Sequence, residues 1–317
     1  MKRHQKYQPN LTLLAAAVSC LGLISAGAEI LLSESFESPA VTGLADTNPN
    51  GWTTTGHPAY QGLVNVDSGQ FTTPYGSQAL SCYTPAGVAN WSYSATTSAL
   101  LSATLTPGKQ YTLSFNVAAV AGRPRAAYRA EIVAINAAGT VTTLLTSKVA
   151  NANSTSNMSS SDSIVFVPNF SHVALIGHRI AVRLGMDYDY GIHGAAYQDQ
   201  PRFDNVVLDA VSTITPEQGS SVLAGPVTLN WTNRAPNTGS DVWVDVWFGI
   251  DPNALTQVVS GGLNLTSFEV NAPGVDTYYW RIDSYLDGSY PGTPLTGLVY
   301  SFKVTDSDGD GLPDEFE

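Results

Sequence analysis

At residues 111–117 the sequence reads Tyr111-Thr112-Leu113-Ser114-Phe115-Asn116-Val117. Larger apolar residues alternate with small polar ones, which is the period of a β-strand with one buried face. On this pattern the side chain of Asn116 points away from the core. Similar runs lie at 128–135, 180–186 and 202–208, separated by breaks rich in Gly, Pro and Asn. The chain is therefore predicted to be all-β, beginning with a β-sandwich, and no segment shows a convincing helical stripe.

A second set of alternating runs begins near residue 213. Val242, Val244 and Val246 alternate with Asp and Trp residues. A unit of about 90 residues with this many strands suits a smaller immunoglobulin-like β-sandwich. Trp243 and Trp247 lie opposite the valine face, where they are either covered by neighbouring strands or form an exposed aromatic patch.

The N-terminal segment has the pattern of an export signal. A basic start is followed by an apolar run at 11–24, which is too short to span a bilayer comfortably, and by small residues before Glu29. Its removal would take the formal net charge from −12 to −15, which argues against nucleic acid as a partner. Cys82 is then the single cysteine, so no internal disulfide forms. We expect a secreted or cell-surface protein with no membrane span in the mature chain.

The predicted organisation has four parts. They are a signal peptide at 1–28, a jelly roll at 29–211, an immunoglobulin-like sandwich at 213–304 and an Asp-rich loop at 305–317.

Several motifs of the first unit carry a resemblance to a known family. They are Glu34-Ser35-Phe36-Glu37, Gly51-Trp52, the Pro107-Gly108-Lys109 turn entering Tyr111, and Phe203-Asp204-Asn205-Val206. The unit resembles the galactose-binding-like jelly-roll carbohydrate-binding modules found beside secreted xylanases and glucanases. The resemblance implies glycan binding and a structural Ca²⁺ that joins the first and last strands through Glu37 and Asp204. The other interpretation makes both residues ordinary turn carboxylates. Asn205 departs from the family pattern, which usually has a second aspartate there.

Alternation also predicts a ligand-binding face on this unit. Asn116, Arg129, Glu131 and Arg183 are expected to point outward and to line one groove, with stacking from Trp91, Tyr188 and Tyr190 in adjacent loops. Sugars need both kinds of group, because their CH-rich faces stack on aromatic rings and their hydroxyls need hydrogen-bonding partners. The alternatives are a solvated salt-bridge face for the two arginines and a core position for Trp91.

The last twelve residues have the oxygen-ligand spacing of a Ca²⁺ loop. Asp306, Asp308 and Asp310 stand at positions 1, 3 and 5, Leu312 offers its carbonyl at position 7, and Asp314 and Glu317 stand at positions 9 and 12. No entering helix precedes the loop, so it resembles a thrombospondin type-3 loop, whereas the alternative is a plain acidic tail. We expect a chain that continues beyond Glu317.

The second unit resembles fibronectin type III modules through Thr277-Tyr278-Tyr279-Trp280-Arg281-Ile282, which implies a spacer with Tyr278 as a corner tyrosine. No protease, hydrolase or nucleotide-binding motif occurs, and Cys82 is expected to be a buried small apolar residue. These observations predict a non-enzymatic protein that binds a glycan or polysaccharide and calcium. The alternatives are an adhesive surface protein that contacts cell-surface or matrix components, and an accessory fragment of a larger secreted hydrolase.

Overall fold

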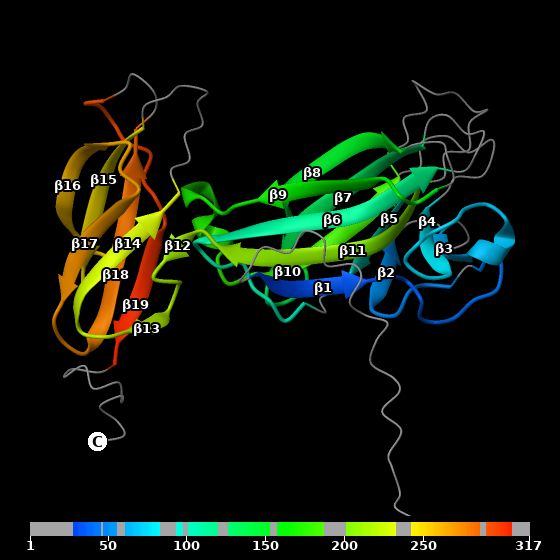
Figure 1. The fold of residues 1–317 in the computed structure, drawn as a ribbon, viewed down its shortest axis with the longest axis horizontal. Coiled ribbons are helices and arrows are strands. Elements are labelled where there is room, and N and C mark those ends of the chain that lie inside the picture. Colours follow the sequence, from blue (N-terminus) through cyan, green and yellow to red (C-terminus); the bar gives the residue numbers. More distant parts are fainter. Residues whose placement is uncertain are drawn as a thin grey trace, which may run out of the picture.

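The computed structural model describes residues 28–45, 47–55, 61–82, 93–97, 101–119, 126–152, 157–186, 201–232, 242–285 and 290–305. Within these ranges the chain consists of β-strands, turns and two short 3-10 segments, η2 (Val66–Ser68) and η3 (Phe170–Leu175). Figure 1 shows the strands gathered into two bodies, β1–β11 and β12–β19. The predicted all-β class with two sandwiches is confirmed. Among these residues no helix has the length and apolar character of a membrane span.

The first sandwich has two antiparallel sheets. One has the order β3-β4-β11-β6-β9, with β1 also paired to β11, and the other has the order β2-β5-β10-β7-β8. The strands of the first sheet are β1 (Glu29–Glu34), β3 (Gln61–Asn65), β4 (Gln78–Cys82), β6 (Lys109–Ala119), β9 (Ser161–Phe166) and β11 (Pro201–Ser212). Those of the second are β2 (Trp52–Thr55), β5 (Tyr93–Thr97), β7 (Ala126–Ile135), β8 (Thr142–Ala152) and β10 (Arg179–Met186).

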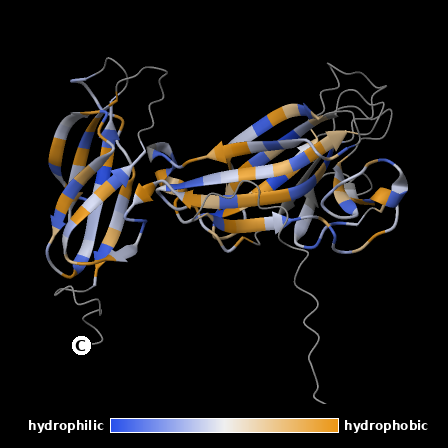
Figure 2. Cartoon of the chain, viewed as in Figure 1, coloured by the Kyte–Doolittle hydropathy of each residue, from blue (hydrophilic) through white to orange (hydrophobic). Residues whose placement is uncertain are grey.

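The core of this jelly roll lies between the two sheets. Tyr111, Leu113 and Phe115 of β6 are buried there, as alternation predicted. Phe115 meets Tyr128 of β7 and Phe203 of β11 edge to face, with ring centroids 5.6 and 5.8 Å away. Figure 2 shows hydrophobic and hydrophilic positions alternating along the strands of both bodies. The period-two pattern therefore reports which side of each strand is buried.

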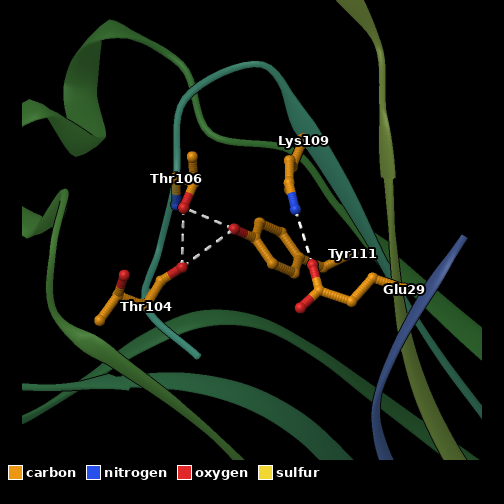
Figure 3. Close-up of polar contacts among 5 residues, drawn as sticks. All are labelled: Glu29, Thr104, Thr106, Lys109 and Tyr111. Atoms are coloured by element: carbon orange, nitrogen blue, oxygen red, sulfur yellow. Dashed lines mark hydrogen bonds and ion pairs between the residues drawn. The ribbon is translucent and has the colours of Figure 1, made fainter. Parts of the chain in front are cut away.

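Tyr111 also fixes the segment that enters β6 (Figure 3). Its hydroxyl accepts a hydrogen bond from Thr106 N at 2.8 Å and donates to Thr104 O at 3.3 Å. Lys109 pairs with Glu29 of β1 at 2.8 Å. Burial raises the pKa of Tyr111, which keeps the hydroxyl protonated as this donor. The turn before β6 is thus held to its own strand and to the start of β1.

The second sandwich pairs a three-stranded sheet with a five-stranded one. The orders are β12-β14-β17 and β13-β19-β18-β15-β16. The strands are β12 (Ile214–Thr215), β13 (Ser220–Val222), β14 (Gly225–Trp231), β15 (Trp243–Gly249), β16 (Thr256–Leu263), β17 (Ser267–Ala272), β18 (Asp276–Ser284) and β19 (Val299–Val304). Trp280 and Phe302 are fully buried at its centre.

Two predictions about this sandwich concern residues of β15 and β18. Tyr278 donates a hydrogen bond to Gly274 O at 3.1 Å, which is the contact of a corner tyrosine. Trp243 and Trp247 face away from the core and are half-buried. Tyr290 stacks on Trp243 at 4.5 Å, and the Arg281 guanidinium lies over Trp247 at 5.0 Å. Trp247 is therefore covered by a side chain of the neighbouring strand β18, as expected, whereas the cover of Trp243 comes from a loop residue.

Candidate functional site

Strands β7 and β10 bring three of the predicted ligand-binding residues to one place. Glu131 and Arg183 are direct partners across the two strands, and Arg129 lies two residues before Glu131 on the same face. Tyr128, Ala130 and Ile132 of β7 point into the core. The residues between them therefore project from the opposite face of the β2-β5-β10-β7-β8 sheet, as the alternation predicted.

The three side chains form a linked ion pair. Arg183 Nη1 lies 3.2 Å from Glu131 Oε2, and Arg129 Nη1 lies 3.5 Å from Glu131 Oε1. The Glu131 side chain is only 6 % exposed, whereas those of Arg129 and Arg183 are 42 % and 33 % exposed. The pairing that the salt-bridge interpretation requires is therefore present. Because the carboxylate lies beneath and the arginines are partly open, the arginines can still offer N–H donors to a ligand.

Asn116 does not join this group, so the predicted four-residue groove is wrong in this respect. Asn116 lies on β6, in the other sheet. It faces away from the core as expected, but it is buried because the 158–160 segment packs over it. Its amide donates to Met158 O at 3.0 Å and to Ser160 O at 3.3 Å, and it accepts from Asn205 at 3.1 Å. All these contacts are internal and give Asn116 a structural role.

Other predicted site residues lie outside the described part of the chain. They are the stacking residues Trp91, Tyr188 and Tyr190, and the tail ligands Asp306, Asp308, Asp310, Leu312, Asp314 and Glu317. Cys82 is described and fully buried, and burial raises the pKa of its thiol to about 12. The thiol is thus a core group, as expected, and is not poised as a nucleophile.

A second polar cluster surrounds Asp204, where a β-bulge interrupts the pairing of β11 with β6. Asp204 is fully buried and accepts hydrogen bonds from the Thr73 hydroxyl and from Asn205 N. The nearby Glu37 carboxylate accepts from Ser77 N, Ser77 Oγ and Gln78 N, each at 2.8 Å. Thr73 gave no sequence signal, since its contact spans 131 residues.

The electrostatics of this cluster oppose an ionised Asp204. Burial raises the pKa of Asp204 to about 7, and the negative charges of Glu37 and Glu34 add to the rise. A bound cation would remove this conflict. Among the described residues no three His, Cys, Asp or Glu side chains are grouped closely enough to hold a metal ion. A cation here would therefore need backbone or hydroxyl oxygens as further ligands, which Ca²⁺ accepts.

The fold and the linked ion pair define a jelly-roll protein with a partly exposed polar cluster on one sheet. The chain belongs to the HpiC1-like family, described as HpiC1 cyclase, whose profile matches residues 31–209. No curated protein matches the chain.

Similar solved structures include carbohydrate-binding modules and a glucanase. The CBM22-1 xylan-binding domain of Paenibacillus barcinonensis Xyn10C is 15 % identical, with a TM-score of 0.35, covering 60 % of this chain and 99 % of its own. The C-terminal family 22 carbohydrate binding module of Clostridium thermocellum Xyn10B is also 15 % identical, with a TM-score of 0.35, covering 58 % of this chain and 93 % of its own. A β-1,2-glucanase from Parabacteroides distasonis is 9 % identical, with a TM-score of 0.29, covering 88 % of this chain and 39 % of its own. These values support no inference about function.

Proposed function

We propose that the jelly roll binds a glycan or polysaccharide, without catalysis, through the outward face of the β2-β5-β10-β7-β8 sheet. The observation that carries this proposal is the geometry of Arg129, Glu131 and Arg183. The buried carboxylate of Glu131 orients the two partly exposed guanidinium groups on the face of the sheet. Planar, preorganised donors suit the paired hydroxyls of a sugar ring, because little side-chain freedom is lost on binding.

Aromatic stacking completes the proposed site. Trp91, Tyr188 and Tyr190 are assigned this role because the described part of the face supplies polar groups and lacks an exposed ring beside Arg183. Asn116 is left out, since its amide is already used internally.

A glycan array followed by titration with soluble xylan, glucan and galactan tests this function. We expect saturable binding of at least one of the three. Absence of binding at about millimolar ligand, a concentration at which even a weak site of about −4 kcal/mol would be about half occupied, contradicts the proposal. That result would favour the adhesive alternative, in which the sandwiches contact cell-surface or matrix components.

Family membership favours one second candidate function. The family description names a cyclase, so a ring-closing activity on a small molecule is the enzymatic alternative. Ring closure by isomerisation conserves mass. A compound in a culture extract that shifts in chromatographic retention, at unchanged mass, only when active protein is added would support this alternative over simple binding.

We further propose that Ca²⁺ binds at two places in a secreted protein. Glu37 and Asp204 would hold one ion, which would neutralise the buried carboxylates and tie the first strand to the last. The Asp-rich loop at 306–317 would hold another, after a second sandwich that acts as a fibronectin-like spacer. The support is the charge conflict at Asp204 and the ligand spacing of the loop.

The tail site has a direct test in the double variant Asp308→Ala/Asp310→Ala. Isothermal titration should show one fewer calcium site than in the parent chain, because two monodentate carboxylates are lost. The lost site should have a Kd on the order of 10⁻⁴–10⁻³ M, typical of extracellular calcium modules. Identical titrations for variant and parent would exclude the tail site.

A further inference from the structure

A cavity of about 530 Å³ lies where the two sandwiches meet. The jelly roll contributes Pro168 and Asn169 to its wall, and the second sandwich contributes Trp231, Ile282, Leu298 and Tyr300. The volume lies within the range of small-molecule sites, which occur preferentially between domains. None of the described residues that line the cavity belongs to the Arg129–Glu131–Arg183 cluster, which lies on the outward sheet face of the jelly roll.

The junction that forms this cavity is held by the turn before β6. Thr213 donates to Gly108 O from its backbone N at 2.7 Å and from its hydroxyl at 3.0 Å. Gly108 has a φ of +72°, and a Cβ built there would lie 2.4 Å from Ile214 Cδ1 and 3.4 Å from the Tyr300 ring. Glycine therefore allows the close approach, and Gly108, Ile214 and Tyr300 all line the cavity.

The chemistry of the wall selects a class of ligand. None of the described residues that line the cavity is charged, although 13 % of the whole chain is. Trp231 and Tyr300 supply aromatic surface, and Ile282 and Leu298 supply aliphatic surface. An ion would lose its hydration in such a site without a countercharge, whereas a neutral, flat apolar group would gain from burial.

A few polar groups of the cavity wall can orient such a ligand. Asn169 Oδ1 accepts from Ser171 N at 3.0 Å and from Ser171 Oγ at 2.6 Å. This contact fixes the amide, so its Nδ2 group can donate toward a bound molecule. Thr296 adds a hydroxyl to the same wall. An apolar wall with a small number of placed polar groups is the usual composition of a ligand site.

We infer that this junction cavity is a binding site for a neutral small molecule with a flat apolar ring system. The site is independent of the proposed glycan face and requires both sandwiches, since neither one alone supplies the wall.

The test uses the full chain and the neutral fluorescent probe N-phenyl-1-naphthylamine. We expect a saturable rise in probe fluorescence at a one-to-one ratio, and binding at least tenfold tighter than for the anionic analogue 1-anilinonaphthalene-8-sulfonate. Thr296→Trp should fill the cavity and weaken probe binding at least tenfold. The matched control, Thr256→Trp, places the same side chain at an exposed position of β16 and should bind like the parent.

Four outcomes would overturn the inference. They are no saturable probe binding, equal affinity for the neutral and anionic probes, unchanged binding by Thr296→Trp, and equal loss in both tryptophan variants. If Thr296→Trp does not fold, Leu298→Ala provides the second test. The Leu298→Ala variant enlarges the cavity and removes an apolar contact with the probe. Weaker probe binding therefore supports the site, and unchanged probe binding contradicts it. The probe is not a sugar, so the probe experiment and the glycan titration can fail independently of each other.

Discussion

In EDTA, the jelly roll should become more stable as the pH falls from about 8 to about 5. The folded state holds Asp204 with a pKa of about 7, raised from 3.8 by burial and by Glu37 and Glu34. Between these two values the folded chain binds more protons than the unfolded chain at this group, so the stability it contributes falls as the pH rises. The difference corresponds to about 4 kcal/mol between the two pKa values, of which about 3 kcal/mol falls between pH 7 and pH 5, as an upper estimate.

Thermal unfolding of the parent and of Asp204→Asn measures this effect. The variant keeps the shape of the side chain and removes the titrating charge, so its unfolding temperature should depend less on pH over this window. Asp209→Asn is the matched control on β11, and it should leave the contribution of Asp204 in place. Equal pH dependence in the parent and in Asp204→Asn would contradict the assignment.

Calcium should reverse the trend, because a bound cation favours the ionised carboxylate. At about pH 8, added calcium should raise the unfolding temperature of the parent, and EDTA should reverse the rise. The comparison is made in the Asp308→Ala/Asp310→Ala background, so that the tail does not contribute. A calcium response that survives Asp204→Asn would remove Asp204 from the proposed ligands.

Gly108→Ala is the second change with a large expected effect. Alanine at a φ of +72° costs about 1–2 kcal/mol in backbone strain. Its Cβ also meets Ile214 at 2.4 Å, and overpacking of this kind costs about 1–3 kcal/mol. We therefore expect a clear fall in unfolding temperature, together with looser docking of the two sandwiches.

Gly69→Ala isolates the steric part of this loss. Gly69 has a φ of +70°, and nothing lies within 4 Å of a Cβ built there. Both variants carry the backbone strain, but only Gly108→Ala carries the clash. Calorimetry should show the larger loss for Gly108→Ala, and small-angle X-ray scattering should show a more extended particle. Equal losses and equal scattering would show that Gly108 does not set the junction.

Alternation in the sequence was enough to predict which side of β6, β7 and β10 is buried. It placed Arg129 and Glu131 on one face of β7 because residues two apart on a strand share a face, whereas the register of β7 with β10 sets Arg183 opposite Glu131. It could not show that β6 belongs to the other sheet, because strand order depends on contacts distant in sequence. Asn116 was therefore grouped with the wrong neighbours.

The sequence pattern also could not show which outward-facing residues are covered by loops. Asn116 and Trp243 both face away from a core, yet the 158–160 segment buries the first and Tyr290 stacks on the second. Thr73 can donate to Asp204 because the pairing of β11 with β4 brings the two segments together. Local periodicity reports the direction of a side chain, whereas its partners depend on the tertiary fold.

The most direct test of glycan binding is an isothermal titration that compares the parent, Arg183→Gln and Lys303→Gln with the polysaccharide that binds best on the array. Each variant removes one positive charge, but Lys303 lies exposed on β19 of the second sandwich. Loss of charge-assisted hydrogen bonds should weaken binding by Arg183→Gln about tenfold or more, whereas Lys303→Gln should bind like the parent. Unchanged affinity in Arg183→Gln, or an equal loss in both variants, would contradict binding through this face.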